Sequence, residues 1–320
     1  MVFKLDERIK LPADREYDVL TAGEMLVDFI SEEDQNTAGQ GTYHPFFGGA
    51  PSNIAMNISR LGIRPIVASA VGNDRLGLFL VESLKKAGID TKCVQIVEDS
   101  TSLVLITKST STPVPIFYRA ADYQLAYTPE LEQVVLKAGF VHFSCWPISM
   151  EPSRQTINRV IEAAKRRGIP VCFDPNYHPQ VWRKGEDGTA YVKKIISQAD
   201  IVKPSEDDAE RLFGRDTPEN QVQKYIALGA GLVIMTLGKD GAIVSNGQET
   251  ARFETLANKV VDTTGAGDAF WSGFYTALVR GATVREALRS GFAVSAFKLK
   301  YTGAVVPLPD LNIIQAEYGC

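Results

Sequence analysis

Residues 262–268 have the sequence Asp-Thr-Thr-Gly-Ala-Gly-Asp and lead directly into a stretch with helical apolar spacing. Gly265 and Gly267 would leave bare backbone N–H groups at the positive end of that helix, where an anion can bind. Asp268 would repel such an anion, so we expect it to accept a proton. An anion site beside a base predicts phosphoryl transfer from a nucleotide to a hydroxyl. The alternative for these residues alone is a tight turn with Asp268 as a helix-start acid.

Composition narrows the class of protein. The 320 residues are 45% hydrophobic and 22% charged, which is typical of a globular protein with a large core. The net charge is -4 and no basic patch with interleaved aromatic residues occurs, so we expect no nucleic-acid partner. No apolar segment is long enough to span a bilayer, and residues 1–10 lack the apolar core of a signal peptide. We therefore expect a cytoplasmic protein without a membrane partner.

The cysteines and histidines are dispersed along the chain. No Cys-x-x-Cys spacing occurs, which favours reduced thiols over disulfides. A transition-metal centre held by protein ligands is not expected either. These residues are Cys93, Cys145, Cys172, Cys320, His44, His142 and His178.

Short apolar runs alternate with helical patterns over most of the chain. The pattern predicts strands at residues 17–23, 66–71, 140–143, 171–173, 201–202 and 232–235, and helices at residues 51–61, 76–87, 157–167 and 206–213. Such alternation indicates a parallel sheet with helices on both faces, which is the α/β class.

Two insertions interrupt this alternation, at about residues 28–47 and 92–122. Within the second insertion, residues 94–97 and 103–107 have no helical period, and as sequence neighbours we expect them to pair antiparallel. The insertions should form a small β-sheet over one end of the main sheet. One domain over residues 1–320, carrying this sheet as a lid, is the simplest account.

Three landmarks follow one another in a fixed order: Gly-Gly-Ala-Pro-Ser-Asn at 48–53, Gly-Asn-Asp-Arg-Leu-Gly at 72–77, and the segment 262–270. Together they resemble the ribokinase-like sugar kinase family over essentially the whole chain. Residues 23–29 and 173–176 are most similar to the fructokinase branch, and 2-keto-3-deoxygluconate kinases are similar at many of the same positions. The resemblance implies a three-layer α/β/α sandwich with a mostly parallel sheet and a small β-sheet lid.

The resemblance also implies roles for individual residues. Asp268 would take the proton from the sugar hydroxyl, while the amides of Gly265, Ala266 and Gly267 would stabilise charge on the transferring phosphoryl group. The sugar would be bound by Asp28, Gly48, Gly49 and Asn53, with Arg119 reaching it from the lid.

The same resemblance implies ATP and magnesium as cofactors, with potassium as a further candidate. Residues along the nucleotide would be Lys203, Ser205, Thr236, Gly238 and Gly241. Asp208 is the expected acid near magnesium, which should be held largely by water and substrate oxygens. Asp262 and Thr264 resemble positions that hold a monovalent cation in relatives.

Two positions bear on the choice of sugar. Ribokinases carry Lys where this chain has Ala50, which disfavours ribose. His178 stands where relatives usually have Arg, whose planar fork binds a carboxylate in bidentate fashion, so a sugar acid is also disfavoured. We expect transfer to the terminal hydroxyl of fructose. The alternatives are a 2-keto-3-deoxygluconate kinase or another sugar or nucleoside kinase of this family.

Other classes are less compatible with the sequence. The first strand ends in Gly23-Glu24-Met25 without a Gly-x-Gly-x-x-Gly turn, which argues against a dinucleotide-dependent oxidoreductase. No Walker-type motif is present. A silent sugar-binding regulator would be expected to lose the base or the glycines, and both are intact here.

Apolar lid residues such as Ile116, Phe117 and Tyr123 predict that two lids pack together in a homodimer.

Overall fold

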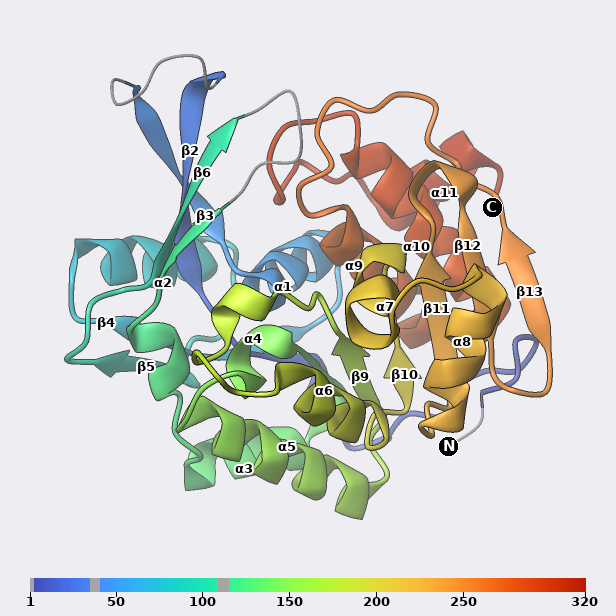
Figure 1. The fold of residues 1–320 in the computed structure, drawn as a ribbon, viewed down its shortest axis with the longest axis horizontal. Coiled ribbons are helices and arrows are strands. Elements are labelled where there is room, and N and C mark those ends of the chain that lie inside the picture. Colours follow the sequence, from blue (N-terminus) through green and yellow to red (C-terminus); the bar gives the residue numbers. More distant parts are fainter. Residues whose placement is uncertain (1–2, 35–40, 109–114) are drawn as a thin grey trace.

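A nine-stranded sheet forms the centre of the computed structural model, which describes residues 3–34, 41–108 and 115–320 (Figure 1). The seven strands from β11 to β5 run parallel, and β12 and β13 add an antiparallel edge. The order is β13 (Thr250–Phe253), β12 (Ala242–Ser245), β11 (Leu232–Thr236), β10 (Ile201–Val202), β9 (Val171–Asp174), β8 (Ala138–Ser144), β1 (Tyr17–Ala22), β4 (Pro65–Gly72) and β5 (Val94–Val97). The predicted α/β class is confirmed.

Helices cover both faces of this sheet because its strands are apolar on both sides. In β1, Leu20 packs into one core cluster and its neighbour Val19 into another, as alternating side chains require. The Leu20 face carries α3 (Pro129–Leu136), α4 (Cys145–Ile148), α5 (Ser153–Arg167), α6 (Gly188–Ile196), α7 (Glu206–Phe213) and α8 (Pro218–Ala227). The Val19 face carries α1 (Ala50–Arg60), α9 (Ala266–Val279), α10 (Val284–Lys298) and α11 (Leu311–Tyr318).

A second, four-stranded sheet stands clear of the helical layers (Figure 1). Its order is β3 (Tyr43–Gly48), β2 (Leu26–Asp34), β6 (Leu103–Lys108) and β7 (Ile116–Tyr118). The outer pairs are antiparallel, and the central β2 and β6 are parallel. The base of the sheet packs with α2 (Arg75–Lys86) in a third apolar cluster. We call this sheet the lid.

One predicted pairing is wrong. Residues 94–97 form β5, which pairs in parallel with β4 through Ser69 opposite Val94, and it does not pair with β6. Parallel strands need a crossover connection, and α2 supplies one between β4 and β5. The second lid segment therefore begins at Leu103. Residues 35–40 and 109–114 of the two expected lid segments lie outside the described residues.

The carboxyl ends of the parallel strands converge on one edge of the main sheet, where ligands bind in open α/β folds. Glu24 follows β1, Asp174 ends β9, Lys203 follows β10 and Thr236 ends β11. The described residues also form short 3₁₀ turns, namely η1 (Ala121–Gln124), η2 (Pro179–Val181) and η3 (Gly238–Asp240). In the described part of the chain, every helix falls short of the length and apolar character that a bilayer crossing needs.

Candidate active site

The glycine turn before α9 is held in one conformation by close packing. Gly265 is the N-cap residue and has a left-handed φ of 73°. A Cβ at Gly265 would lie 2.5 Å from the Cβ of Ala304, so any side chain would collide with the neighbouring loop. On the following residue, the carbonyl of Ala266 accepts a hydrogen bond of 3.0 Å from Ser295 Oγ. The N–H of Ala266 donates to the Thr263 carbonyl at 3.1 Å, whereas the N–H of Gly267 lacks an intrahelical acceptor and is available to an anion.

Asp268 is the third residue of α9 and lines a cavity, where Asn53 Nδ2 donates to its Oδ2 at 3.0 Å. Burial raises the pKa of the Asp268 carboxyl to about 7, the hydrogen bond from Asn53 opposes that shift, and the charge of Asp174 adds to it. The dipole of α9 favours the ionised form of this acid. Burial works against the dipole, so the group titrates in the neutral range.

The cavity beside Asp268 has a volume of about 480 Å³ and lies between the lid and the strand ends. Alternation along the lid strands turns one face towards it. The residues on that face are Leu26, Asp28, Val104, Ile106 and Phe117. We call this space the sugar cavity.

Four of the residues predicted to bind sugar gather at the sugar cavity. Asp28, Gly49 and Asn53 line it, and Gly48 lies directly beneath Asp28, since a Cβ there would be 2.4 Å from Asp28 Oδ2. Gly49 has a φ of 99°, and a Cβ on it would meet the backbone oxygen of Glu24 at 2.4 Å. The buried Oδ1 of Asn53 has no hydrogen-bond partner among the described residues. A ligand hydroxyl could satisfy that oxygen.

Glu24, which sequence reasoning passed over, lines the sugar cavity together with Asp28, Asp174, Asp208 and Asp268. Its Oε1 accepts from the backbone N–H of Ala50 at 3.1 Å, and burial raises the pKa of its carboxyl to about 8. Burial and the nearby charge of Asp268 raise the pKa of Asp28 to about 7. The position of Glu24 just after a parallel strand was the available signal. Asp28 and Asp268 are partly ionised at neutral pH and so disfavour an anionic group near them, while Glu24 is mostly protonated.

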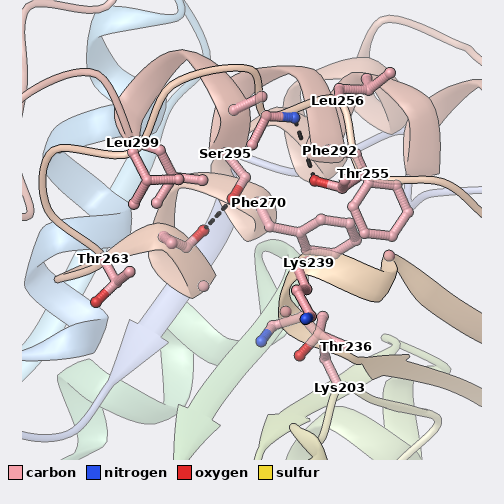
Figure 2. Close-up of a pocket in the computed structure, with 17 residues that line it drawn as sticks. Lys203, Thr236, Lys239, Thr255, Leu256, Thr263, Phe270, Phe292, Ser295 and Leu299 are labelled. Carbon is pink, nitrogen blue, oxygen red and sulfur yellow. Dashed lines mark hydrogen bonds between the residues drawn. The ribbon is translucent and has the colours of Figure 1, made fainter. Parts of the chain in front are cut away.

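A second cavity, of about 370 Å³, lies between η3 and the helices α9 and α10. Figure 2 shows its apolar walls at Leu256, Phe270, Phe292 and Leu299, with the rings of Phe270 and Phe292 centred 4.8 Å apart. Lys203, Lys239 and Thr236 form its polar end. The predicted nucleotide residues found in its lining are Lys203, Thr236, Gly238 and Gly241. An apolar slot with a polar end suits a planar base joined to phosphates.

Ser205 lies elsewhere than the sequence led us to expect. It lines the sugar cavity, and its Oγ accepts from the N–H of Asp208 in the capping box that begins α7. It therefore stabilises a helix start rather than the wall of the second cavity.

The two cavities share one wall. The residues common to both are Lys203, Thr236, Thr263, Ala266 and Gly267. Lys203 Nζ lies 2.9 Å from Asp174 Oδ2 and 3.2 Å from where a Cβ on Gly267 would be. A cation thus stands beside the glycine turn, at the boundary between the cavities.

Asp174 links this boundary to the core and was not among the predicted site residues. Its Oδ2 accepts from Trp271 Nε1 at 2.8 Å as well as from Lys203. Sequence reasoning could have found it from its place at the carboxyl end of β9.

Arg119 does not reach into the sugar cavity. Its side chain is 7% exposed, and it forms an ion pair with Asp122 at 2.6 Å. The remaining N–H groups donate to Ser149 Oγ and to the carbonyls of Val181 and Trp146. With every guanidinium N–H engaged, the structure uses Arg119 to fasten β7 to α4 and η2 instead of the predicted sugar contact.

The carboxylate of Asp208 is already satisfied within the protein. Its Oδ2 accepts from Ser205, and its Oδ1 accepts from the N–H of Tyr177 at 2.6 Å. Burial raises the pKa of Asp208. In the described residues no group of three or more His, Cys, Asp or Glu side chains is placed to hold a metal ion. Magnesium would therefore depend on phosphate oxygens and water, with Asp208 as a neighbour.

The predicted monovalent-cation residues are occupied as well. Asp262 Oδ1 accepts from the N–H of Thr264 at 2.9 Å, and Oδ2 accepts from Gly303 at 2.7 Å. Lys298, with no exposed surface, donates from Nζ to the backbone oxygen of Asp262 at 2.7 Å. These residues do not fit a bound potassium ion, because an ammonium group already contacts the expected ligand residue.

Comparison with known proteins places these features in a family context. The family model described as pfkB family carbohydrate kinase matches residues 17–311. The chain is 55% identical over 317 residues to the ATP-dependent 6-phosphofructokinase of Thermoanaerobacterium thermosaccharolyticum, covering 99% of this chain and 98% of that relative.

Two solved structures are similar in fold and sequence. The Halothermothrix orenii fructokinase is 43% identical with a TM-score of 0.78, covering 88% of this chain and 99% of that one. A double mutant of the Vibrio cholerae fructokinase, solved with fructose, ADP and potassium ion bound, is 27% identical with a TM-score of 0.83, covering 95% and 99%.

Proposed function

Because the chain belongs to the pfkB family of carbohydrate kinases, we propose that it transfers the γ-phosphoryl group of ATP to the terminal hydroxyl of fructose. The observation that carries this proposal is the shared wall: the sugar cavity and the second cavity meet at Ala266 and Gly267. A nucleotide in one cavity and a sugar in the other would bring donor and acceptor together at the turn. Such positioning supplies most of the catalysis in phosphoryl transfer.

Each residue at the turn has a chemical part in the proposed step. Asp268, with a pKa near the working pH, accepts the proton of the attacking hydroxyl. The N–H groups of Gly265 and Gly267 stabilise the charge on the transferring phosphoryl group, and Lys203 adds a positive charge beside them; the Ala266 N–H, bonded to the Thr263 carbonyl, helps to hold the shape of the turn. Magnesium, when bound, would neutralise charge on the β- and γ-phosphates.

The sugar is bound by the acids and the amide of the sugar cavity. Asp28 accepts hydrogen bonds from sugar hydroxyls, and the unpartnered Oδ1 of Asn53 accepts another. Gly49 lets the backbone approach the sugar closely. The lid side chain Phe117 packs edge-on against Trp146 and His178, with ring centres 5.2 Å apart in each pair, and closes the cavity on that side.

Charge favours free fructose as the acceptor. Glu24, Asp28 and Asp268 line the sugar cavity; at neutral pH Asp28 and Asp268 are partly ionised and repel a second anionic group, while Glu24 is mostly protonated. Burial and the charge of Arg211 lower the pKa of His178, which leaves this lining residue mostly neutral. Lys203, a cation in this lining, is paired with Asp174, so a phosphorylated or carboxylated sugar would find little compensating charge there.

Fructose 6-phosphate is the second candidate. The observation that favours it is the 55% identity, over nearly the whole chain, to a relative named ATP-dependent 6-phosphofructokinase. Its phosphate would have to lie away from the three acids, at the outer end of the sugar cavity.

A coupled ADP-release assay tests the proposal on a panel of fructose, fructose 6-phosphate, 2-keto-3-deoxygluconate, ribose, tagatose and adenosine. Fructose is expected to give the highest kcat/KM. A tenfold preference for fructose 6-phosphate, about 1.4 kcal/mol of transition-state discrimination, would establish the second candidate instead. A tenfold preference for 2-keto-3-deoxygluconate would select the sugar-acid kinase.

The cellular location and the oligomeric state of the enzyme are part of the proposal. Use of ATP as the phosphoryl donor suits a cytoplasmic location. We further propose a homodimer that buries the outer face of the lid, because Ile116 and Tyr118 on β7 are 50% and 57% exposed.

A further inference from the structure

Lys298 is a buried cation that the proposed catalytic step leaves unused. It is the last residue of α10, and its side chain has no exposed surface. Burying an ammonium group is unfavourable unless nearby oxygens compensate it. Asp262 supplies the direct contacts: Lys298 Nζ donates to its backbone oxygen at 2.7 Å and lies 3.9 Å from its Oδ2.

Asp262 connects Lys298 to the glycine turn through hydrogen bonds. Its Oδ1 accepts from the N–H of Thr264, the residue directly before Gly265, and its Oδ2 accepts from Gly303. Gly303 adjoins Ala304, against which Gly265 is packed. The ammonium group therefore holds the start of the turn from behind without touching either cavity, as neither lining includes it.

The charge of Lys298 also acts on the site. Burial lowers the pKa of the Lys298 ammonium, while the charges of Asp262 and Asp268 oppose that shift. In return, the Lys298 charge works to keep Asp268 ionised. A positive charge behind the turn thus favours both an anion at the N–H groups and an ionised base.

We infer that the ammonium group of Lys298 takes the place of a bound monovalent cation, so that this kinase works without potassium. A related fructokinase was solved with potassium ion bound. Here Asp262, one of the residues expected to hold such an ion, already contacts the Lys298 ammonium group, and an added cation would meet like charge. Lys298 is a positioning residue, since it acts through Asp262 and the turn. The inference rests on the proposed kinase function.

The first test uses the unaltered protein. Turnover is measured on the best sugar of the panel in potassium chloride, sodium chloride and choline chloride at equal ionic strength. We expect kcat to change by less than about twofold, a difference of roughly 0.4 kcal/mol in the barrier. A rise of fivefold or more in potassium would overturn the inference, because the ion would then have a site of its own.

The second test removes the charge with Lys298→Met. We expect its kcat in choline chloride to fall about tenfold or more, as for other lost charge stabilisation, and to recover at least partly in potassium or ammonium chloride. Potassium should also raise the melting temperature of this variant, relative to choline, by mass action, and leave that of the wild type unchanged. The matched control is Lys300→Met, two residues along the chain, where the lysine pairs with Glu317 at the surface.

These readouts separate the inference from the function itself. Absence of turnover on every sugar would contradict the proposed kinase function, and the melting temperatures would still report on the cation. Full turnover of Lys298→Met in choline chloride would overturn the role of Lys298. If that variant does not fold, the wild-type cation comparison decides alone.

Discussion

Asp268 lies between groups that act on it in opposite directions, with Asn53 and two lysines favouring the ionised form and burial opposing it. Replacing Asp268 by Asn keeps its size and most hydrogen bonding but removes its capacity to accept a proton. We expect kcat to fall by a factor of about 10² to 10⁴, while calorimetry shows little change in the binding of ATP and sugar. Asp207→Asn, at an exposed acid in the first turn of α7, is the control. Retention of more than about a tenth of wild-type kcat would make Asp268 a helix-start residue.

The pKa of Asp268 predicts how the reaction depends on pH. Below a pH of about 7 the carboxyl is protonated and cannot act as a base, so kcat/KM for the sugar should rise from pH 5 to pH 8. The folded state also binds this proton more tightly than the unfolded chain, so stability falls as pH rises from the ordinary value of 3.8 through 7. Asp268→Asn should therefore melt above the wild type at pH 8. A melting temperature below that of the wild type would contradict the buried environment described here.

At the scale of single residues, the sequence predicted the site residues that lie together in one contiguous motif. The turn and Asp268 lie within seven residues, and glycines before a helix have few physical interpretations. Glu24 and Asp174 were missed although their places at the ends of parallel strands were a signal, and Lys298 was missed because its partner Asp262 is distant in sequence. The sequence led us to expect a contact between Arg119 and the sugar, but the side chain points away from the sugar cavity. A motif does not tell which way a side chain points.

The start of α9 is the element on which the anion site depends. An Ala at position 265 would have a left-handed backbone, and its Cβ would lie 2.5 Å from that of Ala304. Gly168, the C-cap residue of α5, has nearly the same φ of 71° but open space around it. We expect Gly168→Ala to cost about 1 kcal/mol of unfolding free energy from backbone strain alone. Gly265→Ala should lower the unfolding free energy by more than this and should also lower kcat. Equal losses for the two variants in urea unfolding would show that the loop around Ala304 moves to accommodate the added Cβ.

The Arg119 contacts make a prediction about how the lid is attached. Removing one partner of a buried ion pair leaves the other charge uncompensated, at a cost of about 3–5 kcal/mol. Arg119→Met should lower the free energy of unfolding by that amount, measured by denaturant titration, because Asp122 is fully buried. The double variant with Asp122→Asn should recover part of the loss. Unchanged stability with a raised KM for the sugar would instead restore the sugar contact expected from the sequence.

Among the elements, those with a single strong pattern were predicted well. The helix expected at residues 206–213 is α7, and the capping box of Ser205 and Asp208 marks its start. The strand β5 was assigned to the wrong sheet because residues 94–97 are apolar, short and next to β6 in sequence. Which sheet such a strand joins depends on the crossover through α2, which local pattern does not encode.

At the scale of the whole molecule, the lid turns one face to the sugar cavity, while its other face packs with α2 at the base and carries exposed apolar side chains on β7. Phe117 points inward, and the alternation of β7 turns Ile116 and Tyr118 outward, where they are 50% and 57% exposed. We expect equilibrium sedimentation to give twice the chain mass of 35.0 kDa.

Charge placed on that outer face tests where the two chains meet. Ile116→Glu should produce a monomer, because a buried unpaired carboxylate is costly in an apolar interface. Ile313→Glu is the matched control, since Ile313 is 58% exposed on α11, away from the lid. Phe117, the next residue in β7, lines the sugar cavity, so loss of the partner lid should also loosen that wall and raise KM for the sugar. A wild-type protein of single-chain mass at high micromolar concentration would rule out the dimer, and a monomeric Ile313→Glu variant would place the interface elsewhere.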